Sequence, residues 1–180
     1  MRIVVSGTHA SGKSTLISDF ALRHPGFTVL PDPFELVEED GDVPNAELFA
    51  AQLRISADRL LDQTHGTHLI AERGPLDFLA YLLAWADLSG TQLNAGFLDR
   101  AAALTAEALR AVDLLVVLPL TASDPIFVGD DEYLDLREAM NDVLLDLLDD
   151  PDLIGDRLRV EEITGTPEAR LAALARASSK

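Results

Sequence analysis

The chain contains no cysteine among its 180 residues. Disulfide bonds, thiolate metal sites and cysteine nucleophiles are therefore excluded. It also lacks an apolar run of the roughly 18 residues that would span a bilayer, and no charged segment followed by an apolar stretch opens it. From these absences we expect a cytoplasmic protein.

Basic residues are the second scarcity. Lys and Arg total 14 against 31 Asp and Glu, which gives a formal net charge of -17. A surface of this sign repels phosphate backbones and anionic membranes, so neither a nucleic acid nor a membrane is an expected partner. The length and the 48% hydrophobic content suit one globular domain over residues 1–180. Apart from the terminal Lys180, the single lysine is Lys13.

Lys13 lies in the most specific motif of the chain, the segment GTHASGKST at residues 7–15. It matches the pattern G-x-x-x-x-G-K-[ST], with an apolar run before it and a helical pattern after it. In a loop of this kind backbone N–H groups surround phosphates, the lysine contacts the β- and γ-phosphates, and the hydroxyl ligates Mg²⁺. We therefore predict an ATP-binding P-loop made by Gly7, Thr8, His9, Ala10, Ser11, Gly12, Lys13, Ser14 and Thr15.

Apolar runs and helical spacings alternate along the rest of the chain. Strands are expected at residues 2–6, 27–30, 68–71, 113–120 and 158–163. Helices are expected at residues 14–23, 44–63, 76–86, 93–111, 133–149 and 168–177. This order predicts an α/β fold: a five-stranded parallel sheet with helices on both faces, in a three-layer sandwich of the P-loop kinase kind. A Pro-, Gly- and Asp-rich segment at about 121–137 is expected to form a lid.

Ligands of such sheets lie at the carboxyl ends of the strands, which nominates three further residues. Glu72, at the end of the third strand, is a candidate Mg²⁺ ligand together with Ser14. The adjacent Arg73 is expected to orient an acceptor hydroxyl or to offset charge, the alternative being a structural ion pair. Asp32 follows the second strand and is the candidate general base, although an aspartate between two prolines also suits an ordinary turn.

Two more residues have roles that the sequence leaves open. Arg137, in the expected lid, would contact the γ-phosphate or stack on adenine; alternatively it would rest on Tyr133 or Asn141 on its own helix face. It is the only basic residue between Ala111 and Arg157, so the lid is poor in arginine. Gln52 on the second helix would either line an acceptor pocket or face solvent.

With these motifs the chain resembles the small P-loop kinases of nucleosides and nucleotides, among them AAA-type domains related to nicotinamide riboside kinase and the deoxynucleoside kinases. Glu72 and Arg73 match the first two residues of the deoxynucleoside kinase Glu-Arg-Ser motif, and Gly74 replaces its serine. Asp32-Pro33 matches in type the Glu-Pro that supplies the base. The resemblance further implies that Thr164, Gly165 and Thr166 pack on adenine.

Three functions follow as hypotheses. The leading one is an ATP- and Mg²⁺-dependent kinase that phosphorylates a hydroxyl of a small-molecule acceptor, a nucleoside or a nucleotide, with Lys13, Asp32, Arg73 and Arg137 as catalytic residues. The second is a regulatory module that binds a nucleotide without transferring phosphate, and the third is an NTPase within a larger assembly. No Asn-Lys-x-Asp motif occurs, which argues against GTP. Whether the chain forms a homodimer is left open.

Overall fold

A parallel sheet lies at the centre of the computed structural model, which describes residues 1–36, 44–120 and 133–179. Within these residues the sheet has five strands in the order β2-β3-β1-β4-β5, and every neighbouring pair is parallel. The strands are β1 (Arg2–Ser6), β2 (Thr28–Leu30), β3 (Leu69–Glu72), β4 (Leu114–Val117) and β5 (Arg159–Glu162). The predicted five-stranded parallel sheet is therefore confirmed.

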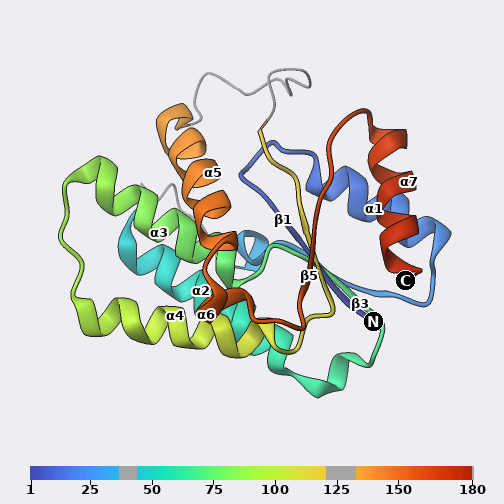
Figure 1. The fold of residues 1–180 in the computed structure, drawn as a ribbon, viewed down its shortest axis with the longest axis horizontal. Helices are drawn as coiled ribbons and strands as arrows, with labels where there is room; N and C mark the ends of the chain where they lie inside the picture. The colour runs from blue at the N-terminus through green and yellow to red at the C-terminus, as the bar shows by residue number, and fades with distance from the viewer. Residues whose placement is uncertain (37–43, 121–132, 180) are drawn as a thin grey trace.

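Helices cover both faces of the sheet, as expected for parallel strands (Figure 1). Two of them, α1 (Lys13–Arg23) and α7 (Pro167–Ser178), lie together on one side. The opposite side carries α2 (Ala46–Leu61), α3 (Pro75–Ser89), α4 (Ala95–Leu109) and α5 (Leu134–Leu148). Short elements complete the described chain: η1 (Pro33–Leu36), η2 (Gln63–His65) and α6 (Pro151–Ile154). The three-layer α/β sandwich is confirmed.

The interior positions of the central strands β1, β3 and β4 are apolar because both faces of these strands are buried against helix layers. In β1, Val4 belongs to the core beneath α2 to α5, whereas Ile3 and Val5 belong to the core beneath α1 and α7. Successive side chains of a strand point to opposite faces, so a strand covered on both sides needs apolar residues at every position. The same alternation holds in β3 and β4.

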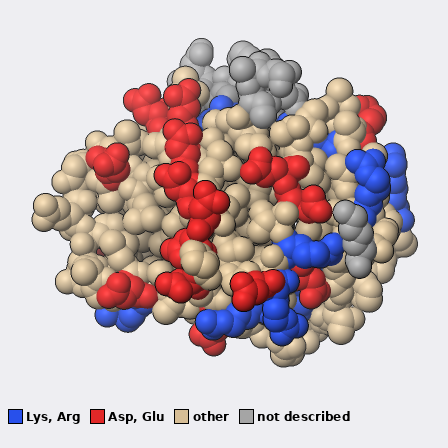
Figure 2. Space-filling view, in the orientation of Figure 1, with Lys and Arg blue, Asp and Glu red and all other residues tan. Residues whose placement is uncertain are grey.

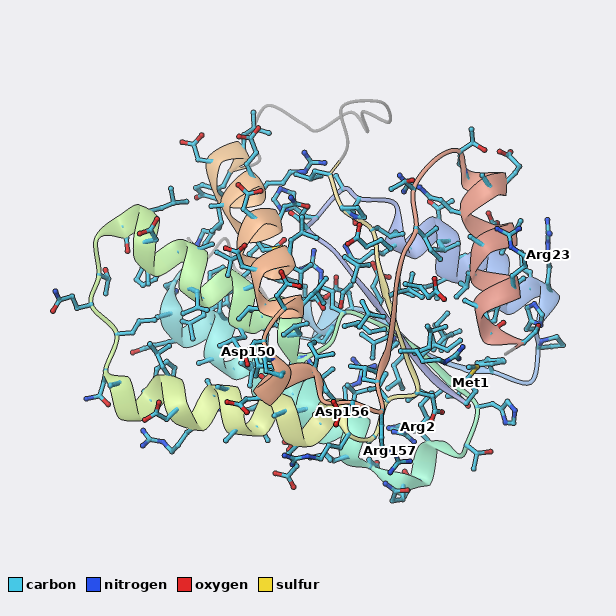
Figure 3. All side chains as sticks on the ribbon, viewed as in Figure 1. Met1, Arg2, Arg23, Asp150, Asp156 and Arg157 are labelled. Carbon is cyan, nitrogen blue, oxygen red and sulfur yellow. The ribbon has the colours of Figure 1, made fainter. Side chains whose placement is uncertain are left out.

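The predicted bounds of most helices and strands differ from the observed ones by a few residues. The short helix α6 was not predicted. Asp150 accepts a hydrogen bond from the backbone N–H of Asp152 and so caps α6, with Pro151 in its first turn. Figure 3 labels Asp150 where α5 gives way to α6. Of the expected lid, residues 121–132 lie outside the described part. None of the helices in the described ranges is long and apolar enough to cross a bilayer.

Candidate active site

The loop between β1 and α1 has the backbone shape that its glycines predict. Gly7 and Gly12 have φ of 147° and 86°, and Ala10 adopts the left-handed region at 48°. A Cβ on Gly7 would lie 2.8 Å from the carbonyl oxygen of Leu118, just after β4, so only glycine fits there. The residue after Gly12 begins α1, whose N-terminus therefore points at the loop.

Three basic side chains bond to backbone carbonyls of this loop. Lys13 Nζ donates to the Thr8 carbonyl at 2.7 Å. Arg137, from α5, donates to the carbonyls of His9 at 3.1 Å and Ala10 at 3.3 Å. From α7, Arg170 Nη1 donates to the Ser11 carbonyl at 2.7 Å. In a trans peptide the C=O and the following N–H point in opposite directions, so the N–H groups of residues 10–12 point away from Arg137 and Arg170, toward the side where an anion would bind.

Ser14 and Glu72 are in contact beside the P-loop. The Ser14 hydroxyl donates to Glu72 Oε1 at 2.8 Å, across 58 residues of sequence. Burial raises the pKa of Glu72 above its ordinary value, against the opposing effect of the Ser14 hydrogen bond and the nearby Lys13. A hydroxyl and a carboxylate are the hard oxygen donors that Mg²⁺ prefers, so the pair fits the predicted metal site.

Asp32 and Arg73 form an ion pair beside this site. Arg73 Nε lies 3.2 Å from Asp32 Oδ2. Arg73 is 4% exposed and has φ of 60°, an unusual conformation for a residue with a side chain. Its guanidinium stacks over the rings of Phe34, 4.9 Å away, and Tyr81, 5.2 Å away. Strain of this kind at a buried charge is typical of functional positions.

A cavity of about 390 Å³ brings these groups together. It is lined by His9, Ala10, Ser11, Gly12, Lys13, Ser14, Thr15, Asp32, Glu72 and Arg73. The structure thus places five side chains from three strand ends, those of Lys13, Ser14, Asp32, Glu72 and Arg73, around one space. Burial, followed by repulsion from Arg73, lowers the pKa of Lys13 to about 7. Burial, with Arg73, Arg137 and Lys13 nearby, also lowers the pKa of His9 to about 4, which leaves its ring neutral at pH 7.

The two other predicted contacts lie around the cavity rather than in its wall. Arg137 donates hydrogen bonds to the P-loop backbone, at the carbonyls of His9 and Ala10. Residues 164–166 are exposed, and the Thr166 hydroxyl accepts from Ala169 N to cap α7. Arg170 Nε donates to the Gly165 carbonyl at 2.8 Å while its Nη1 contacts Ser11, so this one side chain joins the expected adenine loop to the P-loop.

Sequence reasoning missed Asp77 and Tyr81 of α3. Asp77, which is fully buried, accepts hydrogen bonds from Ser6 Oγ at 2.7 Å, Gly7 N at 2.8 Å and Gly74 N at 2.9 Å. Burial raises the pKa of Asp77, although these donors oppose the change. The Tyr81 hydroxyl accepts from the backbone N–H of His9 at 2.9 Å. An aspartate three residues after a Gly-Pro helix start was the available signal for Asp77.

Gln52 is the other buried polar group of interest. Its side chain is 0% exposed, and neither its amide oxygen nor its nitrogen has a hydrogen-bond partner in the parts of the chain that the structure describes. Phe49, one turn earlier on α2, stacks on Tyr81 with ring centroids 5.2 Å apart. A buried amide without partners is costly, which is expected where a ligand supplies them.

Comparison with known proteins gives one family and several similar folds. Residues 2–168 match the family model of the AAA domain. Thymidylate kinase from Candida albicans has a similar structure, with a TM-score of 0.68, 19% identity, and coverage of 98% of this chain and 90% of that chain. Deoxyadenosine kinase from M. mycoides with bound dATP is also similar, with a TM-score of 0.68, 13% identity and full coverage of both chains. No curated protein matches the chain. The fold is that of the small P-loop nucleotide kinases.

Proposed function

This chain belongs to the AAA domain family, and on that premise we propose that it is an ATP- and Mg²⁺-dependent kinase. It moves the γ-phosphoryl group of ATP to a hydroxyl of a small metabolite. The observation that carries the proposal is that Asp32, Glu72 and Arg73 line the same cavity as Lys13 and Ser14. A protein that only binds a nucleotide has no need of a base and a buried arginine beside the phosphates.

Five side chains of the cavity have a part in this reaction. Lys13 and the loop N–H groups bind the phosphates, and Ser14 and Glu72 hold Mg²⁺, which when bound offsets phosphate charge. Asp32 takes the proton of the acceptor hydroxyl as its oxygen bonds to the γ-phosphorus. The bond from that phosphorus to the oxygen bridging the β-phosphate breaks, and ADP leaves. Arg73 offsets the charge that develops on the transferred group.

We propose a nucleoside or nucleotide as the acceptor. Two aromatic side chains, Phe34 and Tyr81, lie against Arg73, and a third, Phe49, stacks on Tyr81. Such rings suit a planar base, and the unpartnered amide of Gln52 on α2 suits its hydrogen-bonding edge. Proteins of similar fold are kinases of thymidylate and deoxyadenosine. We further propose that residues 164–166 pack on adenine, and that the enzyme works in the cytoplasm as a single domain.

One observation favours a second candidate, a regulatory module that binds ATP without transferring phosphate. Arg137 is the only basic residue between Ala111 and Arg157, and its guanidinium is bonded to the P-loop backbone. In this arrangement the Arg137 guanidinium is used to hold the backbone of the P-loop. Of the Lys and Arg side chains, a kinase would then have only Arg73 and Lys13 in the cavity to stabilise the transferred group.

The two candidates are separated by measuring ADP release from Mg-ATP, alone and with a panel of nucleosides, nucleotides, sugars and amino alcohols. We expect one class of acceptor to stimulate release strongly. ATP binding without stimulation by any acceptor would favour the regulatory module. Lys13→Ala should abolish ATP binding in either case, and unchanged ATP affinity in that variant would refute the P-loop assignment.

A further inference from the structure

A second hollow lies away from the nucleotide cavity, between α3 and the first turn of α5. Its volume is about 510 Å³, and it shares no lining residue with the P-loop cavity. Most of its wall is apolar, with Trp85 and Leu88 on α3 and Tyr133, Leu134 and Leu136 at the start of α5. We call these five residues the α3–α5 groove.

Three of the five residues of the groove are large apolar side chains that are more than half exposed to solvent. Leu88, Tyr133 and Leu134 are 52%, 53% and 52% exposed. Of the large hydrophobic residues that are exposed in the described chain, the remaining two, Leu22 and Val29, lie elsewhere, on α1 and β2. Exposed apolar patches that gather in a hollow are typical of sites where another chain docks.

An acidic stripe runs from the groove along α5. It consists of Asp135, which also lines the groove, and the exposed residues Glu138, Asp142, Asp146 and Asp149. At 3.6 residues per turn these five side chains fall within about 80° of the helix circumference. None of them forms an ion pair with any residue of the described chain. Figure 2 shows the resulting column of acidic side chains over the position of α5.

The charge decides which partner fits. A second copy of this chain would bring its own net charge of -17, and nucleic acid or an anionic membrane would bring phosphate, so all three are repelled by the stripe. We propose that the α3–α5 groove and the acidic stripe bind a basic amphipathic helix of a protein partner. Its apolar side chains enter the groove, and its Lys and Arg side chains face the carboxylates of α5.

The chain carries its own probe for this proposal, because Trp85 is its single tryptophan and lines the groove. The ligand for the test is a synthetic Leu/Lys peptide of about 18 residues, or about five helical turns, with Leu at helical spacing. We expect it to shift the Trp85 emission in a saturable way. A peptide of the same composition with its Leu residues scrambled, and a Leu/Glu peptide with the original spacing, should bind at least about tenfold more weakly.

Surface variants test where the peptide binds. Leu134→Asp, and the double change Glu138→Lys with Asp146→Lys, should each weaken binding about tenfold or more. The matched controls Leu22→Asp on α1 and Glu107→Lys on α4 change exposed residues elsewhere and should leave the affinity unchanged. Equal binding of the scrambled peptide, or no effect of Leu134→Asp, would overturn the proposal. So would sedimentation that shows a dimer of the free protein which Leu134→Asp dissociates.

Discussion

The Ser14 hydroxyl donates to the carboxylate of Glu72 at 2.8 Å, and this contact joins the first turn of α1 to the end of β3. Because the two oxygens would share one Mg²⁺, Glu72→Gln should raise the Mg²⁺ concentration needed for half-maximal ADP release about tenfold or more. Activity titrated against Mg²⁺ measures this. Glu107→Gln, on the exposed face of α4, is the control. A normal Mg²⁺ requirement in Glu72→Gln would exclude Glu72 as a metal-site residue.

Asp32→Asn removes the proposed base while it keeps the size of the side chain. We expect ATP affinity to be retained and acceptor phosphorylation to fall by about two orders of magnitude or more, the usual contribution of general base catalysis. Calorimetry and product formation measure the two quantities separately. Asp58→Asn, exposed on α2, is the matched control. Wild-type transfer rates in Asp32→Asn would leave Asp32 with the turn and the Arg73 ion pair alone.

Protonation of His9 should destabilise the fold in mild acid. Its pKa is lowered from 6.5 to about 4, so the unfolded chain binds more protons between these two values. The free energy of unfolding should therefore rise with pH between about 4 and 6.5, and the contribution of neutral His9 to stability should disappear as the pH falls through this range. Urea unfolding at pH 4.5 and 6.5 should show a smaller difference for His9→Gln than for the wild type or for His68→Gln, which changes an exposed histidine.

Asp77 is a stability residue at the base of the P-loop. Asp77→Ala leaves three buried donors, on Ser6, Gly7 and Gly74, without their acceptor. We expect the free energy of unfolding to fall by about 3 kcal/mol, the scale for breaking a buried polar network. Denaturant unfolding measures the change, with Asp87→Ala on the exposed end of α3 as control. A loss no larger than that of the control would show that the network contributes little.

Arg170 should position the nucleotide site without touching the reacting atoms. Arg170→Ala removes the bonds to both Ser11 and Gly165, so ATP affinity should fall about tenfold while kcat at saturating ATP changes little. Arg176→Ala, exposed on the same helix, should behave as the wild type. Arg170→Lys should recover only part of the affinity, because an ammonium cannot reproduce the fork geometry of a guanidinium. A pure loss of kcat would contradict a positioning role.

Much of the fold followed from hydrophobic pattern, but the ends of its elements depend on their neighbours. The fourth strand was predicted over residues 113–120 because the apolar run continues to Leu120. The observed strand ends at Val117, paired with Ser6, the last residue of β1. Parallel pairing needs a partner strand alongside, so the end of β1 limits β4. The sequence of β4 contains no sign of this limit.

Site residues that follow a strand end could be predicted from the sequence. The buried residue Asp77, which supports the P-loop from a helix, was not predicted. Ser14, Asp32, Glu72 and Arg73 come together because parallel strands end at one edge of the sheet. Asp77 was missed because it lies within helix α3 rather than at a strand end, and its partner Ser6 is 71 residues away in the sequence. The structure also explains why residue 74 is glycine, since a Cβ there would lie 3.0 Å from a methyl group of Val4.

The bond from Arg170 to Ser11 also has a consequence for biosynthesis. It joins residues 159 positions apart, and because synthesis runs from the N-terminus the P-loop is made well before its partner. At about 5–20 residues per second, the ribosome adds Arg170 roughly 8–30 s after Ser11. During that interval a nascent chain contains the complete GTHASGKST motif but lacks the side chain that fixes one of its carbonyls. We therefore expect a growing polypeptide that still lacks α7 to bind nucleotide more weakly than the finished chain.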